Sequence, residues 1–366
     1  MSIEPADLVP VRVGPMSAEA YSELLHRAER DRIDLSLARQ LLQGAARRAQ
    51  ADQLFAAASR RRDRALGREI TLVAHLHMVT PCEVEPSCRY CSLSSSIPSV
   101  RSERSLLPPG TLLRAVRFAV GRGVRAIVLI GGTNLRGSDE EIRGIVRSVR
   151  RVSAIDLALD VGPSLAPETL GWLKDQGVRT IYSALETTNA REFRRAKPGD
   201  DLDARIALDA HVDRLGMALG NVLMTGLGTS VDLLRSILFL KRYPSLTYLY
   251  FSTFHPVRGT PWAQRRPGSL RLSLRALAIA RLVLPAVHLG LAEVEVEDPG
   301  SAARLAAQLA AGAGNTFAAL LVYPHRTIDN VDAIRREALA AGFTLAGESP
   351  PASPPARSGP ALPATG

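Results

Sequence analysis

The sequence predicts an α/β fold of the (β/α)8 TIM-barrel type with an N-terminal helical extension. Short apolar runs alternate with helix-forming segments eight times over about 250 residues, the usual length of such a barrel. Each run is mostly apolar, as expected of parallel strands that are buried on both faces. Hydrophobic residues make up 46% of the chain, which supplies a large core. A doubly wound open sheet is the alternative that these observations leave open.

The chain divides into three predicted parts. Residues 1–66 form the helical extension, because Ser17 is a suitable N-cap before an acidic first turn and residues 35–42 and 45–65 have helix-forming composition. Residues 67–345 form the barrel. Residues 346–366 are rich in Pro, Ala and Ser, which predicts a disordered tail.

Within the barrel, each predicted strand is followed by a polar or glycine-containing turn and then by a predicted helix. The strands are predicted at residues 70–75, 125–130, 155–161, 178–185, 218–224, 246–252, 287–292 and 315–322. The helices are predicted at residues 108–121, 140–152, 166–176, 203–215, 231–241, 271–284, 301–311 and 332–341.

The amino-acid composition indicates in which cellular compartment the protein works and which classes of partner to expect. No run reaches the roughly 18 apolar residues of a membrane span, and the acidic N-terminus lacks the features of a signal peptide. The formal net charge is +10, but all basic residues except three lysines are arginines, and they are spread along the chain. We therefore expect a cytoplasmic protein with no membrane partner, and we do not expect nucleic acid as a partner. Three cysteines without an even, dispersed pattern also suit a reducing compartment.

All three cysteines of the chain lie on one short loop after the first predicted strand. Cys82, Cys88 and Cys91 have the spacing C-x5-C-x2-C. Three thiolates can hold a soft metal centre, and a four-iron cluster held by three cysteines keeps one iron open for another ligand. A zinc site is the main alternative, with His75 or His77 as its fourth ligand.

This loop resembles the cluster-binding loop of radical S-adenosylmethionine (SAM) enzymes, whose usual spacing is C-x3-C-x2-C. Those enzymes commonly carry an aromatic residue just before the last cysteine, near the SAM adenine, and Tyr90 stands at that position here. The x5 spacing departs from the common pattern and is similar to that of the HmdB-type enzymes of cofactor biosynthesis. The resemblance implies that Cys82, Cys88 and Cys91 hold a [4Fe-4S] cluster and that SAM binds its open iron.

Further motifs extend the resemblance to the biotin synthase-like group, which includes HydE and PylB. Gly131, Gly132 and Thr133 end the second strand, where that group contacts the SAM amino group through backbone. Residues 186–205 look strongly like the HydE and PylB segment in which a glutamate and an arginine hold the amino-acid end of SAM. The resemblance assigns these roles to Glu186 and Arg205. Similar segments at 220–228, 251–261 and 311–316 extend the match over roughly residues 65–325, and the helices before the barrel are also similar.

The resemblance implies an enzyme that cleaves SAM reductively to a 5′-deoxyadenosyl radical acting on a small molecule, with a reductase such as flavodoxin or ferredoxin as electron donor. No cysteines remain for the second cluster of biotin synthase, so sulfur insertion by that route is not expected. We expect HmdB-like cofactor or metabolite biosynthesis, or else an amino-acid mutase or lyase of the PylB or HydE type. Three different functions stay open beside these: a zinc-binding barrel without radical chemistry, a non-catalytic scaffold and an RNA-modifying enzyme.

Polar residues near the carboxyl ends of the predicted strands are candidates for binding the substrate, because barrel active sites lie there. These candidates are Asp160, Asn221, Thr253, His255, Arg258, Glu293 and Tyr323.

Overall fold

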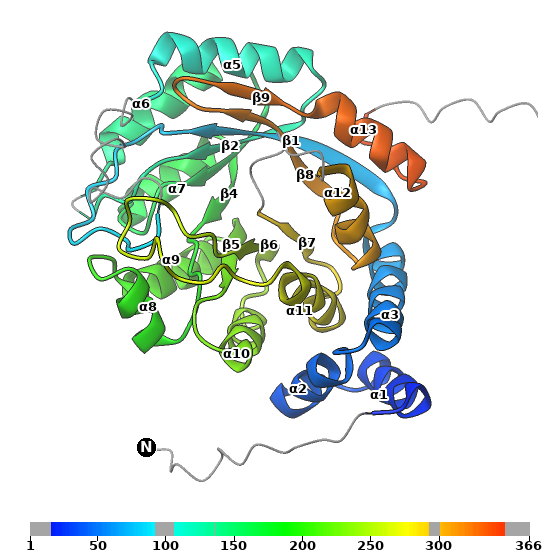
Figure 1. The fold of residues 1–366 in the computed structure, drawn as a ribbon. Coiled ribbons are helices and arrows are strands. Elements are labelled where there is room, and N and C mark those ends of the chain that lie inside the picture. The colour runs from blue at the N-terminus through cyan, green and yellow to red at the C-terminus, as the bar shows by residue number, and fades with distance from the viewer. Residues whose placement is uncertain (1–15, 92–105, 136, 293–300, 348–366) are drawn as a thin grey trace, which may run out of the picture.

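The computed structural model describes residues 16–91, 106–135, 137–292 and 301–347 and shows parallel strands surrounded by helices (Figure 1). The predicted barrel fold is confirmed. Its strands are β1 (Glu69–His77), β2 (Ala126–Ile130), β3 (Asp156–Asp160), β4 (Val178–Tyr182), β5 (Ala218–Thr225), β6 (Leu246–Thr253), β7 (His288–Leu291), β8 (Thr316–Val322), β9 (Thr327–Asp329) and β10 (Thr344–Leu345).

Helices precede and follow the strands. They are α1 (Ala18–Arg30), α2 (Leu35–Gly44), α3 (Arg48–Leu66), α5 (Pro109–Gly121), α6 (Asp139–Arg150), α7 (Pro167–Asp175), α8 (Ala190–Ala196), α9 (Leu202–Arg214), α10 (Ser230–Leu240), α11 (Leu270–Val283), α12 (Ser301–Ala310) and α13 (Val331–Ala340). Local chemistry sets several of their ends. Ser17 caps α1 by accepting from the Ala20 N–H, and Thr229 and Asp232 form a reciprocal capping box at α10.

The strands are arranged in sequence order, β7-β6-β5-β4-β3-β2-β1-β8, and all of these pairs are parallel. β8 returns to β1 with Thr316 opposite Thr71, which brings the sheet round into a barrel. Among the described residues no strand ladder joins β7 to β8. The barrel is therefore only partly closed by hydrogen bonds, a refinement of the predicted closed form. The hairpin strand β9 pairs antiparallel with β8, and the short β10 pairs with β1.

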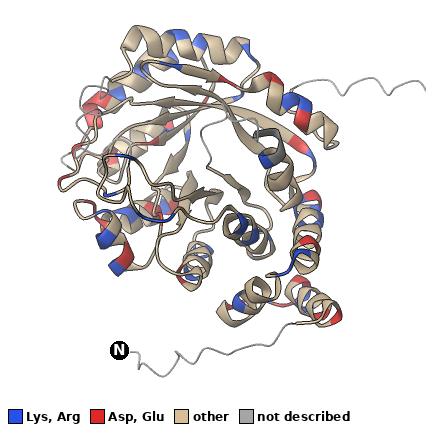
Figure 2. Ribbon diagram, in the orientation of Figure 1, with Lys and Arg blue, Asp and Glu red and all other residues tan. Residues whose placement is uncertain are grey.

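The hydrophobic core lies between the strands and the outer helices. In β1 the side chains alternate, so that Ala74 and Leu76 join this core while His75 and His77 line a pocket inside the barrel. Helices α1–α3 pack beside α10, α11 and α12. Figure 2 shows basic and acidic residues mixed along the outer helices, while the barrel strands are mostly uncharged.

Because the strands are parallel, their carboxyl ends share one end of the barrel, and the cysteine loop leaves β1 there. None of the helices in the described ranges has the length and apolar character needed to cross a bilayer. The tail predicted at 346–366 lies outside the described residues from 348 onward.

Candidate functional site

The first half of the cysteine loop lies directly on the glycine segment that follows β2. The Gly132 N–H donates to the Thr80 carbonyl at 2.9 Å, and the Glu83 N–H donates to the Thr133 carbonyl at 2.9 Å. A Cβ atom on Gly132 would lie 2.2 Å from the backbone of Cys82. Only glycine therefore lets the backbone that carries Cys82 approach so closely.

The second half of the loop is held by α8 and by the segment after β6. The Arg89 N–H donates to the Ala196 carbonyl at 2.8 Å, and the Arg89 carbonyl accepts from the Trp262 N–H at 3.0 Å. Tyr90 is buried, with its ring centroid 6.0 Å from that of Trp262 and 6.4 Å from that of Phe254. Cys88 and Cys91 pack against this apolar cluster. The loop is thus fixed on both sides of its cysteines.

The three cysteines are partly buried, and none of them forms a disulfide bond in the described part of the chain. Burial raises the pKa of Cys88 to about 12, and the neighbouring Lys197 opposes that rise while Cys91 and Cys82 add to it. Cys88 is therefore within electrostatic reach of both Cys91 and Cys82. In the described part of the chain, no three His, Cys, Asp or Glu side chains form a group suited to a single metal ion. His75 and His77, the candidate fourth zinc ligands, line a pocket whose lining includes none of the cysteines.

Glu186 lies just beyond β4 and faces the cysteine loop. Its backbone has a φ of 64°, a left-handed conformation that costs a non-glycine residue about 1–3 kcal/mol, and bonds to Val222 and Met224 of β5 hold it there. Burial raises the pKa of Tyr90 well above its usual value, and the Glu186 carboxylate, hydrogen-bonded to it, adds to the rise. Among the residues that the structure describes, its Oε2 atom is buried and has no hydrogen-bond partner. A buried unpaired carboxylate oxygen is costly, and a cationic ligand group would satisfy it.

Arg205 is buried and joins several parts of the site. Its Nη2 donates to Thr133 Oγ1 at 3.0 Å and to Asp200 Oδ2 at 2.7 Å, and its Nη1 donates to the Ser183 carbonyl. Lys197 Nζ lies 2.9 Å from the same Asp200 oxygen. Arg205, which the sequence predicts to bind a ligand, is therefore already hydrogen-bonded to Asp200. It also contacts Thr133 in the segment after β2. Sequence reasoning missed both Asp200 and Lys197.

The seven candidate substrate residues lie in different environments. Asp160 lines the pocket inside the barrel, and the Tyr323 ring stacks on His77, with 4.3 Å between centroids. The Thr253 hydroxyl lies 2.8 Å from Ser273 on α11, and Asn221 contacts neighbouring backbone and Asp209. The remaining three differ from these: His255 and Arg258 are exposed, and Glu293 lies outside the described residues.

Sequence reasoning also missed most of the pocket. His75 and His77 were predicted only as zinc ligands, and Tyr182 and Tyr250 were not predicted at all, yet all four line it. The period-two spacing of the two histidines in β1 was a usable signal, because residues at that spacing share one face of a strand.

Asn221 and Asp209 form a buried polar cluster behind the end of β4. Asn221 Oδ1 accepts from the Leu185 N–H at 2.9 Å, and its Nδ2 donates to Asp209 Oδ2 at 3.2 Å and to Ser183 Oγ at 3.1 Å. Asp209 is 0% exposed, and burial raises its pKa to about 7. The cluster supports the strand end from which Glu186 follows.

Replacing Asp209 by asparagine is expected to stabilise the protein by about 1–3 kcal/mol near pH 8 and to flatten the dependence of stability on pH. The folded-state pKa of this acid is raised from 3.8 to about 7, so the unfolded state releases its proton first and stability falls as pH rises through that window. Urea unfolding near pH 5 and pH 8 measures the effect. Asp203→Asn, at an exposed position of the same helix, is the control, and an Asp209→Asn variant less stable than the parent near pH 8 contradicts the expectation.

No model of a known protein family matches the chain. By sequence it is 27% identical over 237 residues to the [FeFe] hydrogenase maturase subunit HydE of Thermotoga maritima, covering 64% of this chain and 66% of that protein. It is 27% identical over 201 residues to a biotin synthase of Desulforudis audaxviator, covering 54% of this chain and 61% of that enzyme. The chain thus spans less than two thirds of the length of either relative.

Among solved structures, methylornithine synthase (PylB) matches with a TM-score of 0.76 at 18% identity, over 88% of this chain and 97% of that one. This likeness shows that the two share a fold. Together with the sequence relatives, it supports the predicted similarity to the biotin synthase-like radical SAM group. The finer resemblance to HmdB-type enzymes stays a prediction.

Proposed function

We propose that this chain is a radical SAM enzyme of the biotin synthase-like group that acts on a small-molecule substrate. One observation carries the proposal: Tyr90, on the loop that bears all three cysteines, is hydrogen-bonded to Glu186, whose Oε2 is buried with no hydrogen-bond partner among the described residues. The sequence similarity to HydE and biotin synthase supports it.

The residues present suit the two implied cofactors. Cys82, Cys88 and Cys91 would hold a [4Fe-4S] cluster, since thiolates are its usual ligands. Together, the bound cluster and SAM supply reductive cleavage of SAM to methionine and a 5′-deoxyadenosyl radical. The protein contributes placement and exclusion of water.

Around the cluster loop, each remaining residue has a specific task in the proposal. Glu186 Oε2 would accept from the SAM amino group, and Tyr90 would lie near the adenine. Backbone groups of Gly131 and Gly132 would contact the SAM amino group, as the resemblance implies. A carboxylate arriving here can take over the Arg205 N–H that now donates to Thr133 Oγ1 at 3.0 Å, because Asp200 keeps the rest of the guanidinium in place.

For the reaction class, we propose HmdB-like cofactor or metabolite biosynthesis on the strength of the C-x5-C-x2-C spacing. A mutase or lyase reaction on an amino acid, as suggested by the likeness to PylB and HydE, is the second candidate. Either reaction needs one-electron reduction, so a cytoplasmic flavodoxin or ferredoxin is the proposed partner.

Anaerobic reconstitution followed by EPR spectroscopy tests the proposal. The reduced protein is expected to show a four-iron signal that changes when SAM is added, because SAM would bind the open iron. A Cys88→Ala variant, which removes one thiolate, is expected to lose the signal. A colourless parent protein that gives no signal and binds one zinc ion would overturn the proposal and support the zinc alternative.

A further inference from the structure

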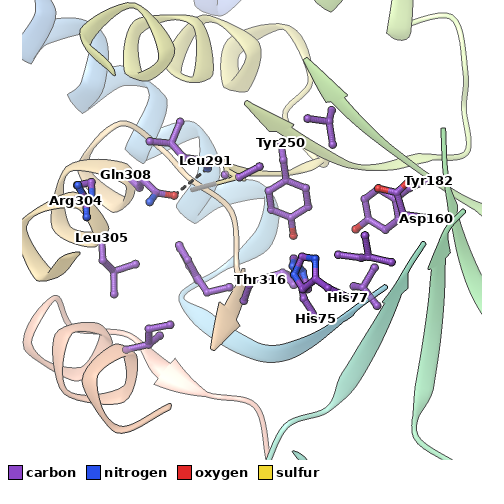
Figure 3. A pocket seen from close by; sticks show the side chains of 18 of the residues that line it. His75, His77, Asp160, Tyr182, Tyr250, Leu291, Arg304, Leu305, Gln308 and Thr316 are labelled. Atoms are coloured by element: carbon purple, nitrogen blue, oxygen red, sulfur yellow. Dashed lines mark hydrogen bonds between the residues drawn. The ribbon is translucent and has the colours of Figure 1, made fainter. Parts of the chain in front are cut away.

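The barrel encloses a pocket of about 190 Å³ that runs from the strand interior towards α12 and α13. Figure 3 shows its two ends. Asp160 and Tyr182 lie at the inner end, His75, His77 and Tyr250 lie in the middle, and Leu305 of α12 lies at the outer end. TIM-barrel interiors are usually filled by branched apolar side chains. This one is instead partly hollow and lined by rings.

The pocket adjoins the proposed SAM site through Asp160. Burial raises the pKa of this carboxyl to about 6, the positive charges of Arg205 and Lys197 oppose the rise, and Glu186 adds to it. The Asp160 carbonyl also accepts from the N–H of Gly131, a residue of the proposed SAM site, at 2.8 Å, while the Asp160 side chain lines the pocket. A substrate in the pocket would lie next to the position where the radical forms.

The inner end of the pocket has the electrostatic character of a cation site. Among the described residues that line this end, Asp160 alone carries a formal charge, and above its pKa that charge is negative. Burial lowers the pKa of His75 to about 4 and that of His77 to about 3, so both imidazoles are neutral at physiological pH. His77 Nε2 is buried and has no hydrogen-bond partner in the part of the chain that the structure describes. No lysine or arginine of the described chain lines this end. Arg304 lines the pocket at its outer end, and Arg205 and Lys197 act on Asp160 from outside the lining.

Two tyrosine rings, Tyr182 at the inner end and Tyr250 in the middle of the pocket, face this region, and glycines on the neighbouring strands make room for them. A Cβ atom on Gly220 of β5 would lie 2.3 Å from the Tyr182 ring, and one on Gly290 of β7 would lie 3.0 Å from the Tyr250 ring. The two ring centroids are 6.4 Å apart. Aromatic faces attract cations when water is excluded. A carboxylate, neutral imidazoles and two phenol rings together suit an ammonium group.

The outer end carries several apolar side chains, and Arg304 and Gln308 of α12 line it as well (Figure 3). Leu291 at the end of β7, Phe317 of β8 and Leu305 of α12 line it. The pocket reaches these residues where β7 and β8 have no ladder among the described residues. The partly open barrel thus leaves apolar side chains at this end of the pocket against which a hydrophobic group can pack.

We propose that the substrate is a small amine with an apolar body, whose ammonium group lies between Asp160 and the Tyr182 and Tyr250 rings. The apolar body extends towards Leu291 and Leu305. This inference rests on the proposed function and narrows the substrate class for the same site.

Calorimetric titration of the reconstituted full-length protein tests the inference with three matched probes: phenethylamine, phenethyl alcohol and hydrocinnamate. Phenethylamine is expected to bind at least about tenfold more tightly than the other two, the factor that one charge-assisted contact supplies. Equal or tighter binding of hydrocinnamate overturns the inference.

Matched variants locate the binding site. Asp160→Asn is expected to weaken phenethylamine binding by about tenfold or more, whereas Asp156→Asn, at the exposed start of the same strand, leaves it unchanged. Tyr250→Leu is expected to weaken binding, and Tyr250→Phe, which keeps the ring, is expected to preserve it. If the Asp160→Asn variant binds phenethylamine as tightly as the parent protein does, the inference is overturned. Urea unfolding shows which variants are folded.

The SAM-dependent EPR signal, recorded on the same preparations, separates the two proposals. A parent protein with the signal but no preference for the amine contradicts only the substrate class. A protein that binds the amine through Asp160 but shows no signal contradicts the radical SAM function and supports an amine site in the barrel.

Discussion

Replacing Asp200 by alanine is expected to lower the free energy of unfolding by about 3–5 kcal/mol, because two buried cations lose their shared partner. The Asp200 side chain is 0% exposed, and those of Arg205 and Lys197 are 3% and 5% exposed. Burial alone would raise the pKa of Asp200, but Lys197 and Arg205 lower it to about 2. Its contribution is therefore present above the unfolded-state value of 3.8 and is lost as pH falls towards 2.

A surface ion pair of the same length provides the control. Arg179 Nε lies 2.7 Å from Asp156 Oδ1, but these side chains are 73% and 50% exposed. Asp156→Ala is expected to cost no more than about 1 kcal/mol, since water screens the exposed pair. Urea unfolding near neutral pH compares the two variants. Equal losses would show that Asp200 does not hold the buried cations in place.

The Asp200 variant should also disturb the SAM site. Arg205 connects Asp200 to Thr133 and to the end of β4, so its guanidinium would lose its fixed position. We expect weaker SAM binding in Asp200→Ala but not in Asp156→Ala, which calorimetry measures directly. The buried ion pairs thus contribute both to the stability of the barrel and to the position of Arg205 at the proposed SAM site.

The barrel could be predicted from sequence because its signals are local. Apolar runs such as residues 125–130 and 246–252 are separated by helices of ordinary length, and each could be recognised alone. The placement of the cysteine loop followed from the fold class, since a loop after a barrel strand lies at the carboxyl end. The open seam between β7 and β8 could not be predicted, because pairing depends on the packing of the whole sheet.

The interior of the site depends on contacts between distant residues. Tyr182 fits because Gly220 lies opposite it on the next strand, and neither residue alone signals a pocket. Asn221 follows Gly220 directly and was predicted to bind substrate. The structure instead shows its amide bonded to Leu185, Ser183 and Asp209. In a strand, one step in sequence moves a side chain to the other face, so the end of a strand does not by itself identify the residues that line the barrel.

Replacing Gly132 by alanine is expected to prevent most of the cluster from assembling and to cost about 1–3 kcal/mol of stability. The new Cβ atom would lie 2.2 Å from the Cys82 backbone, and backbone cannot rotate away as a flexible side chain can. The loop must move, and the hydrogen bonds that join it to Gly132 and Thr133 are then strained or lost. Cys82 shifts relative to Cys88 and Cys91, which remain held by α8 and the Tyr90 cluster.

Iron and sulfide content per chain after reconstitution measures this effect, with circular dichroism to confirm folding. Gly171→Ala on α7 is the matched control, because a Cβ atom there meets nothing within 4 Å and alanine stabilises a helix interior by about 0.5–1 kcal/mol. A folded Gly132→Ala protein with full iron would mean that the cysteines do not depend on the glycine segment. If Gly132→Ala loses iron and Gly171→Ala does not, the main role of Gly132 is to leave room for the backbone of the cysteine loop. The strand end that borders the proposed SAM site would then also position the cluster ligands.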